Sequence, residues 1–143
     1  MRFIIQRVTQ ASCTIDNHVT GKIDNGLCVF IGVSDTDTTK IADKMMSKLI
    51  NMRIFSDSDG KTNLSLKDVN GLLLISQFTL YANCRKGNRP SFTDAGNPEL
   101  ANDLYEYCIE QAEQSVDVVQ TGIFGADMQI ALNNDGPFTI ILD

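Results

Sequence analysis

The sequence predicts an α+β fold: a strongly curved, mostly antiparallel β-sheet or barrel that carries two helices. Leu27–Val33 and Leu72–Ile75 are unbroken apolar runs, typical of strands buried on both faces. Two further segments, near residues 41–52 and 100–112, repeat apolar side chains at helical spacing. The chain has 143 residues and shows no repeat or linker, so we expect residues 1–143 to form a single domain.

Composition and charge exclude several classes of protein. The chain is 43% hydrophobic and 21% charged, which is ordinary for a soluble globular protein. Its net charge of −6 argues against a protein that coats nucleic acid through charge alone, although it permits a local basic patch. No apolar run approaches the ~20 residues of a membrane span, and the N-terminal one is too short for a signal peptide. The four cysteines lack Cys-x-x-Cys spacing, which favours a cytoplasmic protein with reduced thiols.

The first third of the chain is predicted to be mostly β-strand. Phe3–Val8 and Ser12–Ile15 have the composition of strands, Asp16-Asn17 that of a turn, and His18–Ile23 that of a returning hairpin strand. Leu27–Val33 follows as a strand that is apolar throughout.

A helix and two short strands are expected next. Asp35–Thr39 is rich in helix-capping residues, and the apolar stripe that follows predicts an amphipathic helix of about three turns. That stripe consists of Ile41, Met45, Leu49 and Met52. Arg53–Phe55 and the pair Leu64 and Leu66 indicate short strands on either side of a turn at Asp57–Lys61.

Leu72–Leu80 is predicted as the central strand, entered from the turn at Asn70-Gly71. Its final residues are polar, with Ser76, Gln77 and Thr79 ending an apolar run. Buried polar groups cost roughly 1–3 kcal/mol each when unsatisfied. These groups therefore either bond to neighbouring backbone or line a pocket at the strand end.

The last part of the chain is predicted to contain a loop, a helix and three strands. Tyr81–Asn97 has no period and contains glycine and proline, so it indicates a long loop. Asn97-Pro98-Glu99 combines an N-cap, a proline and an acid, which is typical of a helix start. The strands are expected at Val116–Val119, at Ala126–Leu132 and, after a break at Asn133–Pro137, at Phe138–Leu142.

Side chains suited to acid–base or metal chemistry are scarce. His18 is the only histidine, and its place beside a turn favours an exposed or structural role. A metal site needs several ligands, and Asp57-Ser58-Asp59-Gly60 lacks calcium-loop spacing. The sequence has no phosphate-binding glycine loop, dinucleotide fingerprint or Gly-x-Ser-x-Gly elbow. We expect neither a metal nor a cofactor, and an enzyme with this sequence would depend on backbone dipoles, positioning and groups of its substrate.

Three polar segments each have a structural and a functional interpretation. Ser76–Thr79 either bonds to backbone or surrounds a small polar substrate, with Thr79 as a candidate nucleophile that has no base nearby in sequence. Asn134–Thr139 is either a tight turn or, with a cis Gly136-Pro137 bond, a device that orients two successive carbonyls. Arg85, Lys86 and Arg89 share one loop that is either solvated or in contact with a phosphate.

Together these segments resemble the D-aminoacyl-tRNA deacylase family, also called D-tyrosyl-tRNA deacylases. The resemblance lies in Ser-Gln-Phe-Thr-Leu at 76–80, Arg-Pro-Ser-Phe at 89–92 and Asn-Asp-Gly-Pro-Phe-Thr at 134–139. Shorter matches extend it from Gln6-Arg7-Val8 to Ala126-Asp127-Met128, so it covers nearly the whole chain. Each motif alone is weak, but in this order and spacing they are specific. Phe138 stands where many members carry valine, and it keeps the position apolar.

The resemblance implies a cytoplasmic homodimer that hydrolyses the ester between a D-amino acid and the terminal ribose of tRNA. Ser76, Gln77, Phe78 and Thr79 would line the pocket, with backbone groups at Phe78 and Thr79 and the ribose 2′-hydroxyl assisting catalysis. A cis Gly136-Pro137 bond, held by Arg7, would enter the partner's pocket and exclude an L side chain. The terminal adenine would lie near Phe124 and Met128, and the acceptor-end phosphates near Arg85, Lys86 and Arg89.

Two rival functions stay open from the residues alone. One is an esterase or amidase that uses Thr79 as its nucleophile, and the other is a non-catalytic RNA-binding module. On the proofreading hypothesis, glycine has no side chain to exclude, so we also expect glycyl-tRNA to be a substrate.

Overall fold

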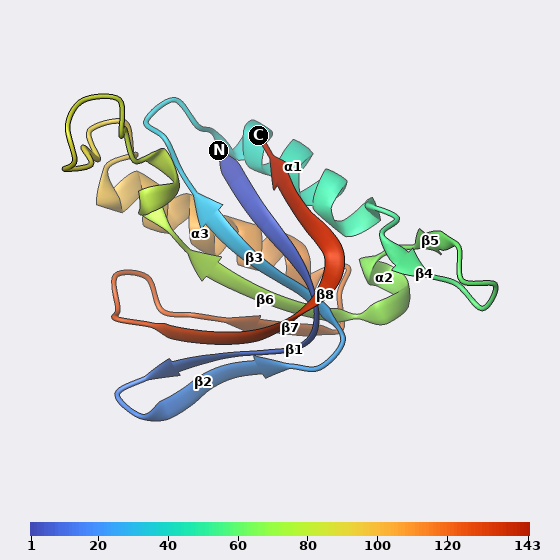
Figure 1. Cartoon of the computed structure of the whole chain (residues 1–143). Coiled ribbons are helices and arrows are strands. Elements are labelled where there is room, and N and C mark those ends of the chain that lie inside the picture. The colour runs from blue at the N-terminus through green and yellow to red at the C-terminus, as the bar shows by residue number, and fades with distance from the viewer.

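The computed structural model describes all residues 1–143 and confirms the α+β fold with a strongly curved sheet (Figure 1). A six-stranded sheet contains β1 (Arg2–Ile15), β2 (His18–Ile23), β3 (Gly26–Gly32), β6 (Gly71–Ser76), β7 (Val118–Thr121) and β8 (Gln129–Leu142). A separate hairpin contains β4 (Phe55–Ser56) and β5 (Thr62–Leu64). The two predicted helices are α1 (Thr39–Asn51) and α3 (Pro98–Glu113), and the structure adds a single turn, α2 (Leu66–Val69), and a 3₁₀ helix, η1 (Phe78–Tyr81). None of these helices is long and apolar enough to cross a membrane.

The long strand β1 organises the sheet. Its first half pairs antiparallel with β3, its second half pairs antiparallel with β2, and β8 runs antiparallel along its other edge. The two predicted strands Phe3–Val8 and Ser12–Ile15 are therefore parts of one strand. On the far side of β3, the strands β6 and β7 continue in parallel, so the sheet is mixed.

The sheet curves so far that β2 approaches β7, which gives it the form of a nearly closed barrel (Figure 1). The backbone N–H of Lys22 on β2 donates to Oε1 of Gln120 on β7, at 3.4 Å. A Cβ atom on Gly21 would lie only 2.9 Å from the carbonyl oxygen of Thr121, so glycine permits this approach. The curvature creates a barrel interior that is distinct from the face covered by helices.

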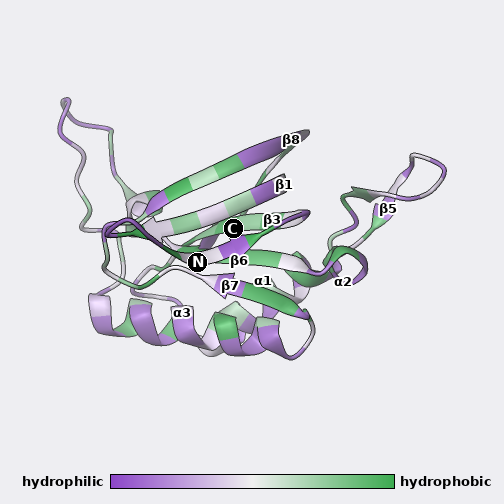
Figure 2. Ribbon diagram, turned by 90° about the horizontal axis from the view of Figure 1, so that it is seen from below, coloured by the Kyte–Doolittle hydropathy of each residue, from purple (hydrophilic) through white to green (hydrophobic).

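Two apolar clusters occupy the two faces of the central strands, which confirms that these strands are buried on both sides. Leu27 and Leu72 belong to the larger cluster, between the sheet and the helices. Cys28, Leu73 and Ile75 belong to the smaller cluster, inside the barrel. Figure 2 shows α1 and α3 as a layer on one side of the sheet. The continuous apolar runs in β3 and β6 reflect this double burial.

The predicted strand Leu72–Leu80 is wrong at its C-terminal end, because β6 stops at Ser76 and η1 begins at Phe78. The N–H of Gln77 makes a last bond to β3, donating to the carbonyl oxygen of Ile31 at 2.7 Å. There β3 itself ends at Gly32, where a Cβ atom would lie 2.9 Å from Cβ of Leu80. The chain can therefore fold as η1 over the end of β3 because Gly32 has no side chain.

The predicted break at Asn133–Pro137 is also wrong, because β8 continues through it. The turn-forming residues lie where the pairing with β1 shifts register twice, between Gln6 and Val8 and between Val8 and Gln10. Such bulges accommodate extra residues without ending a strand. The Gly136-Pro137 peptide bond is cis.

Smaller boundaries differ in the same way. Leu66 does not extend a strand but opens α2, because the carboxylate of Asp68 accepts hydrogen bonds from the N–H and the hydroxyl of Ser65, at 2.7 and 3.1 Å. Arg53 precedes β4 instead of forming part of it, and Ala126 lies in a turn before β8.

Candidate functional site

A cavity of about 760 Å³ lies where β6 ends, between η1, the loop that precedes α3, the start of α3 and the connection from β7 to β8. Five of the predicted site residues line it together: Ser76, Gln77, Phe78, Phe124 and Met128. They come from two chain segments that are nearly fifty residues apart, so the fold brings them together.

A buried tyrosine fastens the two walls of this cavity to each other. The hydroxyl of Tyr105 on α3 donates to the carbonyl oxygen of Leu74 on β6 at 2.9 Å and lies 3.4 Å from that of Gly122. The N–H of Gly122 also donates to the oxygen of Leu74, at 3.0 Å. Burial raises the pKa of Tyr105, so its hydroxyl stays protonated and remains a donor.

The missing side chain of Gly122 makes room for Met128. A Cβ atom at Gly122 would lie 2.3 Å from Sδ of Met128 and 3.3 Å from Cδ1 of Ile75. The thioether therefore packs directly against the backbone of the β7–β8 connection, where it forms part of the cavity wall.

Two exposed aromatic rings stand at the cavity. Phe78 on η1 and Phe92 on the long loop pack edge to face, with ring centroids 5.2 Å apart and an interplanar angle of 68°. Phe78 is 53% exposed and Phe92 is 41% exposed, although both are large apolar side chains. An exposed apolar surface beside a cavity is typical of a ligand-binding site.

The cavity wall contains one ionisable side chain, that of Asp127. Thr79 does not line the cavity, and its Oγ1 accepts a hydrogen bond from Nε2 of Gln77 at 2.7 Å. No imidazole or carboxylate bonds to that hydroxyl, so nothing in the structure would activate it as a nucleophile. No group of three or more His, Cys, Asp or Glu residues is arranged to hold a metal ion.

Backbone donors are available at the same place. The first N–H groups of a 3₁₀ helix have no partner within the helix, and η1 begins with Phe78 and Thr79. The hydrogen bonds outside regular elements use the N–H of Gln77 and that of Leu80, but not those of Phe78 and Thr79. These two donors are therefore free to bind an oxygen atom.

Arg7, Gly136 and Pro137 lie together, but none of them lines this cavity. The Arg7 guanidinium donates to the carbonyl oxygens of Ile54 at 2.7 Å, Asp135 at 3.2 Å and Gly136 at 3.3 Å. It also pairs with the carboxylate of Asp135 at 3.0 Å and stacks over the ring of Phe138 at 4.4 Å. One buried cation thus holds the backbone of the cis-proline segment from several directions.

The predicted phosphate contacts are exposed and stand apart from the cavity wall. Arg85, Lys86 and Arg89 occupy the tip of the long loop, which is closed by a pair of backbone hydrogen bonds between Asn83 and Ser91, at 2.7 and 3.0 Å.

Several cavity residues were missed by sequence reasoning. In the sequence, Phe92 is only the last residue of the motif at 89–92 and Asp127 only the middle residue of the motif at 126–128, yet both line the cavity. Gly96 and Pro98 line the wall because the start of α3 packs there, and the pattern around them indicates only a helix start.

Comparisons with known proteins agree with this arrangement. The family described as D-Tyr-tRNA(Tyr) deacylase matches residues 4–143. A D-aminoacyl-tRNA deacylase of Lactobacillus gasseri is 54% identical, covering 100% of this chain and 99% of that protein. One of Fervidobacterium nodosum is 50% identical, covering 100% of this chain and 97% of that protein.

Two solved structures have the same fold. A protein described as c-Myc DNA Unwinding Element Binding Protein is 38% identical and superposes with a TM-score of 0.94, over 100% of this chain and 98% of that one. A probable eukaryotic D-amino acid tRNA deacylase superposes with a TM-score of 0.84 at 18% identity, over 99% and 97% of the two chains. The full-length match to the family and the identity of its bacterial relatives show that this chain belongs to the D-Tyr-tRNA(Tyr) deacylase family.

Proposed function

We propose that this protein hydrolyses the ester bond between a D-amino acid and the terminal ribose of tRNA. The observation that supports this most directly is the cavity at the end of β6, where Ser76, Gln77 and Phe78 face Phe124 and Met128. The match of these segments to the deacylase family covers both walls of the cavity. We place the reaction in the cytoplasm, where aminoacyl-tRNA is used.

The chemistry that fits this cavity is water attack assisted by the substrate. Free N–H groups at Phe78 and Thr79 can stabilise the oxyanion that develops when an ester carbonyl is attacked. The cavity wall offers Asp127 as its one ionisable side chain, and we assign the proton transfer to the substrate instead. The ribose 2′-hydroxyl can take the proton of the attacking water while it gives its own proton to the leaving 3′-oxygen. Removing one oxyanion donor typically lowers kcat by about 10²–10³-fold, so these two N–H groups can account for a substantial part of the catalysis.

A tRNA that ends in 2′-deoxyadenosine, charged at its 3′ position, tests this mechanism. We expect it to be cleaved far more slowly than the ribose form. Asp127→Asn is the complementary variant, because it should leave the rate on the ribose substrate nearly unchanged. Equal rates on the two tRNAs, together with loss of activity in Asp127→Asn, would assign the base to the carboxylate instead.

Rejection of L-amino acids requires a second subunit in this proposal. Gly136 and Pro137 do not line the cavity of their own chain, while Arg7 holds their backbone firmly. In a twofold homodimer this segment would enter the partner's cavity and complete it. Sedimentation at assay concentration should therefore show an active dimer, and a fully active monomer would contradict the proposal.

Gly136→Ala probes the same segment without disturbing the subunit. A Cβ atom at Gly136 would meet only Nδ2 of Asn134, at 3.8 Å, so the variant should fold normally. In the partner's cavity the added methyl group should narrow the space for the substrate and lower the rate on D-tyrosyl-tRNA. A wild-type rate on D-tyrosyl-tRNA in this variant would show that Gly136 does not contribute to the partner's active site.

If the protein rejects L-amino acids by steric exclusion of their side chains, it should not reject glycyl-tRNA. Glycine lacks the side chain that the Gly136-Pro137 segment would exclude, and small apolar contacts are worth only about 1–3 kcal/mol. The rate of cleavage of glycyl-tRNA should therefore be well above that of L-alanyl-tRNA, after correction for spontaneous hydrolysis. If both esters survive equally, the pocket must instead recognise a D side chain directly.

The central experiment is a matched deacylation assay on D- and L-tyrosyl-tRNA. We expect release of the D-amino acid and survival of the L-ester. A protein that binds both tRNAs and cleaves neither would be a non-catalytic RNA-binding module. Thr79→Ala tests whether Thr79 is a nucleophile. Abolished turnover would support that role, whereas a modest loss would fit a structural role through the hydrogen bond between Thr79 and Gln77.

A further inference from the structure

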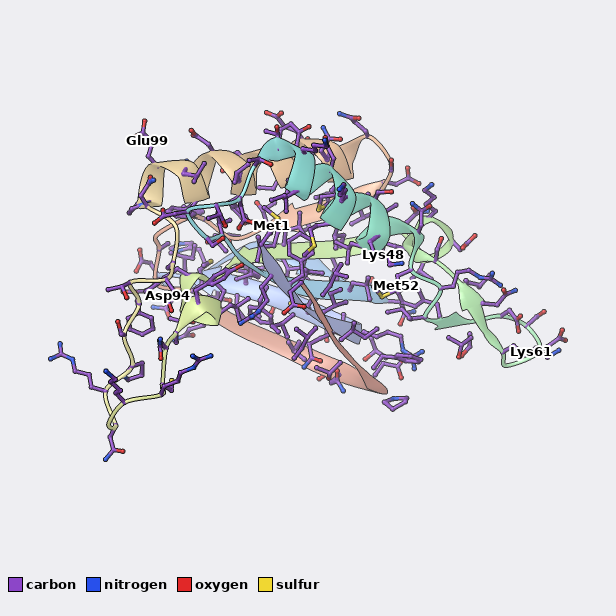
Figure 3. The ribbon with its side chains drawn as sticks, turned by 90° about the horizontal axis from the view of Figure 1, so that it is seen from above. Met1, Lys48, Met52, Lys61, Asp94 and Glu99 are labelled. Carbon is purple, nitrogen blue, oxygen red and sulfur yellow. The ribbon has the colours of Figure 1, made fainter.

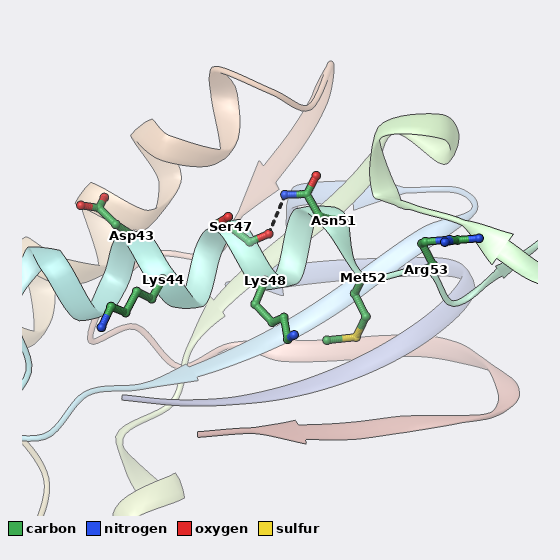
Figure 4. Close-up of a pocket in the computed structure, with 7 residues that line it drawn as sticks. All are labelled: Asp43, Lys44, Ser47, Lys48, Asn51, Met52 and Arg53. Carbon is green, nitrogen blue, oxygen red and sulfur yellow. Dashed lines mark hydrogen bonds between the residues drawn. The ribbon is translucent and has the colours of Figure 1, made fainter.

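A second hollow on the molecule carries cations that have no part in the proposed reaction. It lies along α1 and the residues that follow, has a volume of about 700 Å³, and is lined by Lys44, Lys48 and Arg53 with Asp43, Ser47 and Asn51 (Figure 4). We call this hollow the α1 groove.

The charge of the α1 groove is unlike that of the rest of the chain. The protein carries a net charge of −6, yet residues 40–56 contain four cations and one carboxylate. The cations are Lys40, Lys44, Lys48 and Arg53, and none of them is in an ion pair. The carboxylate of Asp43 accepts a hydrogen bond from the hydroxyl of Tyr107 on α3, at 2.7 Å. Asp43 is therefore the one counter-charge within residues 40–56, and the four cations outnumber it.

The spacing of the lysines makes this arrangement unfavourable for the free helix. Lys40, Lys44 and Lys48 are four residues apart, so their side chains lie on one side of α1, about 6 Å apart along its axis. Like charges at this spacing destabilise a helix. A bound polyanion would remove that repulsion, and lysines on flexible stems suit contacts to phosphate.

The α1 groove lies next to the segment that would complete the partner's cavity. Arg53 directly precedes Ile54, and one Arg7 guanidinium bonds both the carbonyl oxygen of Ile54, at 2.7 Å, and that of Gly136, at 3.3 Å. The chain's own cavity lies elsewhere: in Figure 3, Lys48 and Met52 lie on the side of the molecule toward Lys61, whereas Asp94, next to the cavity residues Thr93 and Ala95, lies on the opposite side. Through Arg7, the groove is thus connected to the segment that would complete the partner's cavity.

We propose that the α1 groove binds phosphates of the tRNA whose aminoacyl end occupies the partner subunit's cavity. This inference rests on the proposed function and its twofold dimer. Phosphate contacts of this kind position the nucleic acid without reading its sequence. They also explain how an acidic protein can act on RNA, since the cations gather where the RNA would pass.

Neutralising the groove tests the contact. We compare Lys44→Gln/Lys48→Gln with Lys22→Glu on β2, because both change the net charge by −2. The substrates are D-tyrosyl-tRNA and the D-tyrosyl ester of adenosine, which lacks the phosphates. For the groove variant on tRNA, kcat/KM should fall about tenfold, and the slope of its logarithm against log[salt] should become shallower by about 1–2.

The adenosine ester separates this inference from the proposed function. It should be cleaved equally by the wild type, the groove variant and the Lys22→Glu control. An unchanged rate on tRNA, or an equal loss on both substrates, would overturn the groove contact. If the wild type cleaves neither substrate, the proposed function itself fails.

Mixed dimers test whether the contact crosses the subunit boundary. One dimer joins a subunit with the neutralised groove to a subunit whose cavity is filled by Ala126→Trp. Its one open cavity faces an intact partner groove, so it should retain full activity on tRNA per open site. A second dimer joins the wild type to a subunit with both changes, and it should show the tenfold loss. The reverse result would place the groove on the RNA of its own cavity and overturn the inference.

Discussion

Arg7 offers the sharpest test of how the cis-proline segment is held. Its side chain is buried, donates to three carbonyl oxygens and lies over an aromatic ring. In Arg7→Met, a side chain of comparable length keeps the packing but loses every one of these polar contacts. In Arg7→Lys, the charge remains, but one ammonium group cannot reach carbonyls that the planar guanidinium spans.

The size of the effect follows from the individual contacts. The bond to the Ile54 oxygen is short and buried, so losing it leaves an unsatisfied acceptor at a cost of about 1–3 kcal/mol. The bonds to Asp135 and Gly136 are longer and partly buried, and water can replace them. The Asp135 carboxylate is 46% exposed, so its ion pair adds less than about 1 kcal/mol. With the stacking on Phe138, we expect Arg7→Met to lower the free energy of unfolding by about 3 kcal/mol.

Urea unfolding measures this loss, at one protein concentration throughout because the apparent stability of the proposed dimer would depend on concentration. Arg7→Lys should lose about half as much as Arg7→Met. Both variants should also cleave L-tyrosyl-tRNA faster relative to D-tyrosyl-tRNA than the wild type does. A Met variant within about 0.5 kcal/mol of the wild type, with unchanged discrimination, would refute the reasoning.

Three further predictions concern the cavity, the sheet and the buried thiols. Gly122→Ala should displace Met128 and raise KM for aminoacyl-tRNA, since the new Cβ would lie 2.3 Å from its sulfur. Gly71→Ala should lower Tm by roughly 10 °C, because its Cβ would lie 2.2 Å from a backbone oxygen in the turn before β3, a clash of about 3 kcal/mol. Burial raises the pKa of Cys28 and Cys108 from 9.0 to about 12 each, so unfolded thiols release protons first and stability should fall between pH 9 and 12. Urea midpoints at pH 8 and 10 measure that fall.

Each of these predictions has its own control. Gly136→Ala serves both glycine variants as a control for folding and Tm, since its Cβ would have no neighbour closer than 3.8 Å, but not for KM, because it is itself expected to affect the substrate. An unchanged KM in Gly122→Ala, or a wild-type Tm in Gly71→Ala, would show that the backbone yields easily at those positions. The dependence on pH should weaken in Cys28→Ala, and equal urea midpoints at pH 8 and 10 would contradict the effect of the thiols.

The elements that the sequence predicted well are those whose residues alone determine their burial. Leu72–Ile75 is apolar at every position, and the structure buries one face of β6 against helices and the other inside the barrel. The start of α3 was equally clear, because Asn97 caps its own helix by accepting a bond from the N–H of Leu100. In both cases the deciding interactions are local or depend only on hydrophobicity.

The elements that sequence reasoning missed depend on distant neighbours. The strand β6 ends early because η1 packs over Gly32, which is more than forty residues away in the chain. Residues typical of turns do not end β8, because its pairing with β1 absorbs them as bulges. Asp127 and Pro98 were missed as cavity residues for the same reason. Their positions depend on how α3 and the β7–β8 connection pack against distant parts of the chain.

Arg7, Gly136 and Pro137 lie outside the wall of their own chain's cavity, and on the proposed mechanism this has a consequence for selectivity. A device that rejects a side chain by steric exclusion works only if it does not yield, since a shift of about 1 Å can admit the excluded group. Arg7 provides that rigidity: it joins the Gly136 carbonyl to the Ile54 carbonyl on another segment of the chain. The lining of the α1 groove ends at Arg53, one residue before Ile54, so on the proposed dimer the same guanidinium couples the excluding segment to the surface that would hold the RNA. Substitution of Arg7 should therefore weaken discrimination between D- and L-amino acids for esters of adenosine as well as for esters of tRNA. Neutralising the α1 groove should instead slow the hydrolysis of tRNA esters alone and leave that discrimination unchanged.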